Sequence, residues 1–155
     1  MQEATGQAGL MNIMLTIIGI IIVLLAGSIA YSKAFRVKNK IIDVIEKNSV
    51  FNNVAQSEID SVLTDFGYRV IDRDKLKSYC PSNKFEGFDL VESTMQTHLY
   101  CVYRSKDNAS KTYYYKVVSF MYFDIPVVGN FIEIPVTGET KVFFTESTEK
   151  WKIIK

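Results

Sequence analysis

An uncharged apolar segment near the amino terminus constrains this chain more than any other feature. Glu3 is the only charged residue among the first 32, and Leu10–Tyr31 consists mostly of isoleucine, leucine, methionine and valine. A helix over these 22 residues is roughly 33 Å long, enough to cross a hydrocarbon core of about 30 Å. We therefore expect a short leader at 1–9 and a transmembrane helix at 10–31.

A cleaved secretory signal or a buried core helix would fit this segment less well. A secretory signal has a basic leading region and an apolar stretch of only about 7 to 15 residues, whereas no Lys or Arg precedes Leu10. A buried core helix would need the rest of the chain to cover a helix that is apolar on every face. A membrane span is the favoured interpretation.

The helix is expected to continue beyond the membrane as an amphipathic segment at 32–47. No Gly or Pro interrupts this region, and its apolar residues recur at spacings of three and four while Lys and Arg fall between them. One helix from Leu10 to Lys47 is therefore predicted. The residues that could form a packing face along it are Gly19, Ala26, Gly27, Ala30, Ala34, Val37, Ile41 and Ile45. The small residues among them suit close helix approach, or they reflect ordinary membrane-helix composition.

The remaining chain, 48–155, is predicted to form an α+β globular domain. A short amphipathic helix is expected at 55–67, with Ser57 capping its start and Gly67 ending it. A loop at 72–86 then holds Cys80.

The second part of this domain is rich in β formers. Strands are expected at 97–104 and 112–123 as a hairpin, then at 130–136 and 141–146 around a turn at 137–140, with a last short one at 151–155. Because strands and helices do not alternate, we predict a small antiparallel sheet covered on one face by helices.

Composition and charge exclude several classes of protein. The 18 Lys and Arg nearly balance the 17 Asp and Glu, which disfavours nucleic acid as a partner. Twenty aromatic residues suffice for a small packed core, so disorder is a poor description.

The sequence offers little for catalysis. It has one histidine, His98, and two cysteines, and it contains no CxxC, HExxH or GxSxG motif and no phosphate-binding loop. His98 and Cys101 differ by three positions, so a regular strand points them to opposite faces. We expect no enzyme activity, no cofactor or metal, and no small-molecule substrate.

Whether Cys80 and Cys101 are oxidised or free depends on the side of the membrane on which the domain lies. Outside the cytoplasm they would form a disulfide, and inside it they would be free thiols. Four cations follow the helix, namely Lys33, Arg36, Lys38 and Lys40, and the positive-inside rule places the domain in the cytoplasm on that basis. An even cysteine count favours the disulfide if this non-enzymatic domain is exported.

Several segments share a plan with a known family. The leader holds Gly6-Gln7-Ala8 and Gly9, YSKAFRVKNKIIDVIEKN follows the membrane helix directly, and FDIPVVGNFIEIPVTGETKVFF lies near the end. Together with the sheet and the cysteine pair, they resemble the type IV pilin-like proteins. The chain is most similar to the TadE-like pseudopilins of bacterial tight-adherence secretion systems, and the resemblance covers nearly its whole length.

The resemblance implies a non-catalytic, membrane-held assembly component whose globular part lies outside the cytoplasm. Its long helix would pack against those of other pilin-like subunits or assembly proteins. Gly6 and Gly9 are the candidate leader junctions, although the fifth residue after each is methionine where the family has glutamate. The alternative is a single-pass, membrane-anchored extracytoplasmic module that binds an unknown ligand through exposed aromatic side chains such as Tyr113, Tyr115 and Phe120.

Overall fold

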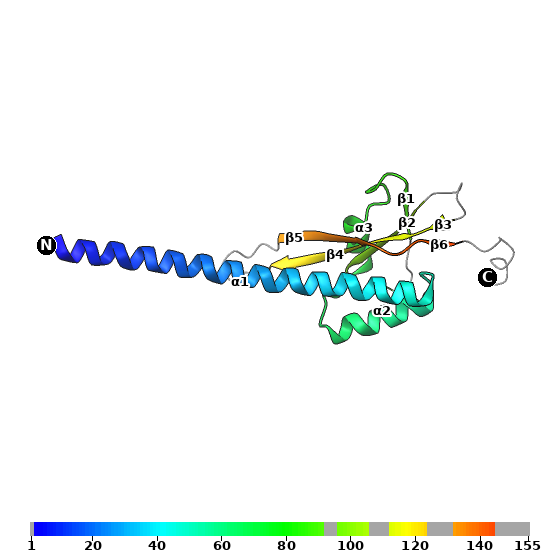
Figure 1. Ribbon diagram of the computed structural model, residues 1–155, viewed down its shortest axis with the longest axis horizontal. Coiled ribbons are helices and arrows are strands. Elements are labelled where there is room, and N and C mark those ends of the chain that lie inside the picture. Colours follow the sequence, from blue (N-terminus) through cyan, green and yellow to red (C-terminus); the bar gives the residue numbers. More distant parts are fainter. Residues whose placement is uncertain (1, 92–95, 106–111, 124–131, 145–155) are drawn as a thin grey trace.

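The computed structural model describes residues 2–91, 96–105, 112–123 and 132–144. One long helix leads into a smaller body of short helices and antiparallel strands, so the predicted α+β class is confirmed (Figure 1). The elements are α1 (Gln2–Asn48), α2 (Asn53–Asp65), α3 (Arg73–Tyr79), β1 (Phe88–Leu90), β2 (Tyr100–Ser105), β3 (Thr112–Tyr113), β4 (Tyr115–Phe123), β5 (Ile132–Glu139) and β6 (Phe143–Phe144).

Helix α1 is unbroken over 47 residues, which corresponds to a length of roughly 70 Å. The prediction of one helix through both the apolar and the amphipathic segment is confirmed, and the helix also includes most of the expected leader. It continues to Asn48 because no proline occurs before Pro81. It ends where Ser49 adopts a left-handed conformation with φ of 56°. The amino-terminal half of α1 extends away from the body of the protein (Figure 1).

Helix α2 begins four residues before the predicted cap. Its N-cap is Asn52, whose side-chain oxygen accepts a hydrogen bond of 2.9 Å from the Ala55 backbone N–H, so the prediction of Ser57 as the cap is wrong. Asparagine caps a helix as well as serine does, and the earlier cap adds another turn. Gly67, with φ of 56°, follows the helix end as predicted.

The main sheet has the strand order β1-β2-β4-β5, and all of its pairs are antiparallel. The predicted hairpin is present as β2 and β4, with Tyr100 opposite Ser119, although β2 begins three residues later than expected. Strands β3 and β6 form a separate two-stranded sheet.

Two predictions about this region are wrong, and one strand was missed. The loop at 72–86 contains α3, and β1 was not expected. The turn at 137–140 is instead the end of β5, because Gly138 pairs with Val117 and Glu139 pairs with Lys116. The strand expected at 141–146 is reduced to β6 among the described residues, and the strand at 151–155 lies outside them.

The sheet is covered on both faces, not on one. Residues from α1 and α2 pack on one face, where Val37, Ile41 and Ile45 contact the core that contains Val102 and Val117. A second cluster on the opposite face joins α3 and the segment after it to the sheet, and it includes Cys80, Phe88, Leu99, Cys101, Tyr103, Val118 and Phe120. Successive residues of β2 and β4 point to opposite faces of the sheet, and the residues on both faces are apolar. Both faces must therefore be covered by other parts of the protein.

Gly138 allows α1 to approach β5 closely. A Cβ atom at this position would lie 2.7 Å from Lys38 Cδ and 2.9 Å from Ile42 Cδ1, both shorter than a normal contact. Gly138 therefore allows the helix and the strand to pack closely, and it is not part of a turn.

We expect Gly138→Val to lower the free energy of unfolding by about 1 to 3 kcal/mol, because the side chain would overpack the boundary between α1 and β5. Thr137→Val is the matched control, since Thr137 is exposed and pairs with Val118 on the other face. Chemical denaturation in detergent would measure both variants, and equal stabilities would contradict this packing role of the glycine.

Candidate functional site: an exposed apolar half-helix joined to a disulfide-bonded domain

The first half of α1 exposes large apolar side chains on every side. No protein surface covers it within the described residues, and its most apolar window has a mean hydropathy of 2.8. Each of the following is at least 49% exposed: Leu10, Met11, Ile13, Met14, Leu15, Ile17, Ile18, Ile20, Ile21, Ile22, Val23, Leu24, Leu25 and Ile29. The helix is long and apolar enough to cross a membrane.

The small residues predicted as a packing face lie on this exposed half or at its end. A Cβ atom added at Gly19 would meet no atom within 4 Å, and Ala26 is exposed. Gly27 and Ala30 are partly buried where the body of the protein begins. Their contact with other subunits stays a prediction.

Gly6 and Gly9, the candidate leader junctions, both lie within α1. A Cβ atom at Gly9 would meet nothing within 4 Å. Cleavage at either glycine stays a prediction.

The other four predicted packing residues lie in the protein's own core. Ala34, Val37, Ile41 and Ile45 are almost completely buried. The Ala34 carbonyl also accepts a hydrogen bond of 3.1 Å from the buried Ser119 hydroxyl of β4. Side chains enclosed in this way are not available to a neighbouring subunit, so the second half of α1 belongs to the domain.

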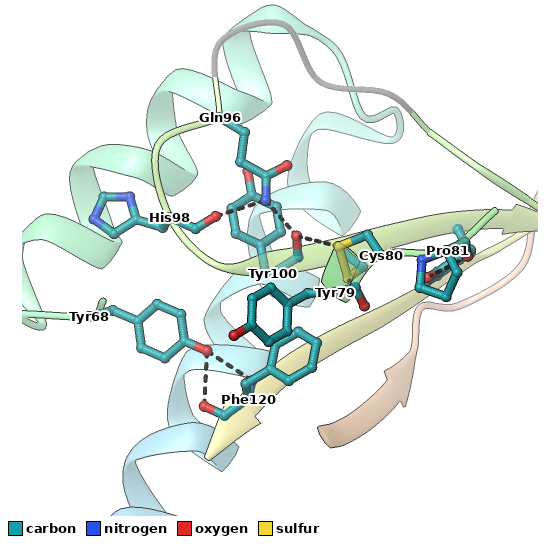
Figure 2. Close-up of a disulfide and its surroundings, with 10 residues drawn as sticks. Tyr68, Tyr79, Cys80, Pro81, Gln96, His98, Tyr100 and Phe120 are labelled. Carbon is teal, nitrogen blue, oxygen red and sulfur yellow. Dashed lines mark hydrogen bonds between the residues drawn. A yellow bond between two sulfur atoms is a disulfide. The ribbon is translucent and has the colours of Figure 1, made fainter. Parts of the chain in front are cut away.

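Cys80 and Cys101 form a disulfide, the pairing that the sequence left open. The bond joins the end of α3 to β2 on the sheet face away from α1, and both residues are buried (Figure 2). Helix α3 has only seven residues, too few to be stable alone. The disulfide therefore holds this short helix on the sheet, helped by the Tyr103 hydroxyl, which donates to the Pro81 carbonyl at 3.1 Å.

Tyr68 hydrogen-bonds the backbone of β4 at Phe120, where β2 no longer runs beside this strand. Its hydroxyl donates to the Phe120 carbonyl at 3.0 Å and accepts from the Phe120 N–H at 2.8 Å (Figure 2). Strand β2 begins at Tyr100, opposite Ser119, so Phe120 has no residue of β2 beside it. The pattern of the sequence offered no signal for this role.

His98 joins the strand region to α2. Its side chain is 2% exposed, and its Nδ1 atom lies 3.0 Å from Asp60 Oδ1 and 3.0 Å from Thr97 Oγ1. Cys101 is occupied by the disulfide, so it forms no Cys–His pair with His98. In the part of the chain that the structure describes, no three His, Cys, Asp or Glu residues are grouped to hold a metal.

The aromatic residues expected to form an exposed binding surface are mostly core residues. Tyr115 and Phe120 are 2% and 5% exposed, and Tyr113 is half-buried and stacked on Phe143. The Tyr115 hydroxyl accepts from the Phe51 N–H at 3.3 Å, and burial raises the pKa of Tyr115. Burial likewise raises the pKa of Tyr103 to about 12. The expectation of outward-facing aromatics at 115 and 120 is therefore wrong.

Comparison with protein families, with curated proteins and with solved structures gives no match for this chain.

We expect Ile41→Ala to lower the free energy of unfolding by about 2 to 5 kcal/mol, because it leaves a cavity between α1 and the sheet. The same substitution at Ile21, which is 50% exposed, should change it by less than about 0.5 kcal/mol. Chemical denaturation of the full chain in detergent would measure the free energy of unfolding of both variants. Equal effects would contradict the division of α1 into an exposed half and a core half.

Replacing both Cys80 and Cys101 by alanine should lower the free energy of unfolding by about 3 kcal/mol, as expected for opening a loop of this length. The double variant is needed because a single one leaves a buried thiol. Wild-type protein treated with reductant should approach the stability of the double variant, and an unchanged stability in both would contradict a stabilising role.

Proposed function

We propose that this protein is a non-catalytic, pilin-like, membrane-anchored structural or assembly component of a bacterial surface or secretion apparatus. The observation that carries the proposal is the division of α1. One unbroken helix has a first half that exposes apolar side chains on all sides and a second half that forms the core of the domain.

This division suits an assembly subunit. In lipid, the first half can pack against other membrane helices, where small residues such as Gly19 and Gly27 allow backbones to approach. The domain cannot rotate independently of that half, because Val37, Ile41 and Ile45 are part of its core. Lateral packing of the membrane helices would therefore set the spacing and orientation of the domains.

The disulfide supports a domain outside the cytoplasm, and the basic residues after the membrane segment are a weak argument against it. Structural disulfides persist mainly in oxidising compartments. The cations after the membrane segment, which argue for the opposite side, are partly used by the fold. Lys33 donates to the Gly67 carbonyl at 2.9 Å, and Lys38 is largely buried with its Nζ atom 4.1 Å from the Phe35 ring centroid. Charges that belong to a folded domain weigh less in the positive-inside rule.

Cross-linking in native membranes tests the assembly role. Gly19→Leu combined with Gly27→Leu should reduce cross-linked species about tenfold, because bulky side chains block close helix approach. Leu24→Ile, on the same exposed half, is the control that keeps size and apolarity. Wild-type protein that gives only monomers under the same conditions would contradict the proposal.

Labelling with a membrane-impermeant maleimide tests the orientation. In intact cells, Cys80 and Cys101 should react only after reduction, because the disulfide protects them and the domain lies outside the cytoplasmic membrane. Reaction of both thiols only after lysis, with no need for reductant, would place the domain in the cytoplasm and contradict the pilin-like role.

A further inference from the structure

Two hollows lie on either side of Lys33, where α1 enters the body of the protein. Each has a volume of about 470 Å³. One is lined by Arg69 and Tyr122 among others, and the other by Arg36 and Phe66. The residues that line the two hollows include three cations, Lys33, Arg36 and Arg69, and no carboxylate.

The position of these hollows along α1 places them at the membrane surface. With Leu10–Tyr31 in the hydrocarbon, the headgroup layer of roughly 5 to 7.5 Å covers about the next three to five residues of the helix. That depth includes Lys33 and Arg36. The hydrogen bond of 2.9 Å from Lys33 Nζ to the Gly67 carbonyl holds the connection between α2 and α3, residues 66–72, at the same depth.

The chemistry of this connection suits a lipid surface. Arg69 lies with its guanidinium carbon 5.0 Å from the Tyr122 ring centroid, and arginine binds phosphate through a planar set of donors. Phe66 and Val70 expose apolar side chains on either side of Gly67, and Val70 is 67% exposed. Cations beside apolar and aromatic side chains are typical of the membrane interface.

We propose that Lys33, Arg36, Phe66, Arg69 and Val70, the juxtamembrane surface, bind the headgroups of anionic phospholipids in the membrane that α1 crosses. This inference rests on the proposed membrane anchoring. It adds a second contact between the protein and the bilayer, so that the domain is held at one angle to the membrane. The exposed carboxylates of Asp65 and Asp72 flank the connection in sequence but do not line either hollow.

Tryptophan fluorescence in reconstituted vesicles tests the inference. Trp151 is the only tryptophan, so Trp151→Phe gives a silent background for Val70→Trp in the full chain. Val142→Trp is the matched control, because Val142 is also an exposed valine but lies beside β6, where the neighbouring Lys141 N–H donates to Glu46 near the carboxyl end of α1. Leu25→Trp reports separately on the membrane segment. Vesicles contain lipids brominated near the headgroup, with or without about one third phosphatidylglycerol.

We expect Val70→Trp to be quenched at least twofold more in anionic than in zwitterionic vesicles, with the difference lost at high salt. Adding Arg36→Gln should reduce that quenching, whereas Lys141→Gln, which removes a cation near β6, should not. Val142→Trp should stay unquenched in both kinds of vesicle.

The outcomes separate this inference from the proposed function. Quenching of Leu25→Trp without quenching of Val70→Trp would overturn the lipid contact and leave the membrane span intact. Equal quenching of Val70→Trp in both kinds of vesicle would overturn recognition of anionic headgroups. No quenching of Leu25→Trp would overturn the membrane span itself, and the lipid contact with it.

Discussion

The contact between the second half of α1 and the sheet is the interaction on which the rest of the structure depends. Val37, Ile41 and Ile45 cover the face formed by β2 and β4, and Gly138 lets the helix approach β5. The sheet alone would expose this apolar face, and the helix alone would expose its stripe. Because one helix contributes both to this core and to the apolar half, the apolar half and the domain form one continuous element.

The opposite face of the sheet is organised by covalent and aromatic contacts. Helix α3 is too short to fold independently, and the disulfide from Cys80 to Cys101 holds it against β2. Aromatic rings fill the remaining surface, with Phe85 packing edge-on against Tyr103 and Phe88 against Tyr114. A small domain with a thin core gains from such a cross-link, and an oxidising compartment would preserve it.

Periodicity predicted the parts of the fold that depend on long, regular patterns. The stripe through Ile41 and the absence of Gly and Pro from residues 32–47 were enough to predict one continuous helix. The hairpin followed from the β formers on either side of a polar connection. The class of fold was therefore accessible from the sequence, whereas the pairing of the two cysteines was left open.

Elements that depend on contacts between distant residues were not accessible. Gly138 looked like a turn residue, because nothing local shows that the side chains of Lys38 and Ile42 pass over it. Asn52 and Ser57 are equally good caps in isolation, and only packing selects between them. The bond between His98 and Asp60 and the bridge from Tyr68 to Phe120 join residues at least 38 positions apart. The expectation that Tyr115 is exposed was wrong for the same reason, since β6 and the segment around Phe51 cover its side chain.

The unbroken course of α1 has a mechanical consequence. From Tyr31 to Asn48 the helix extends roughly 25 Å beyond the apolar segment, so a tilt of about 20° in the bilayer displaces its far end sideways by about 9 Å. No hinge within α1 absorbs that movement, so the domain moves together with the helix as one rigid body. In a membrane, a tilt of this size would displace the far end of the helix by about the distance between two packed helices.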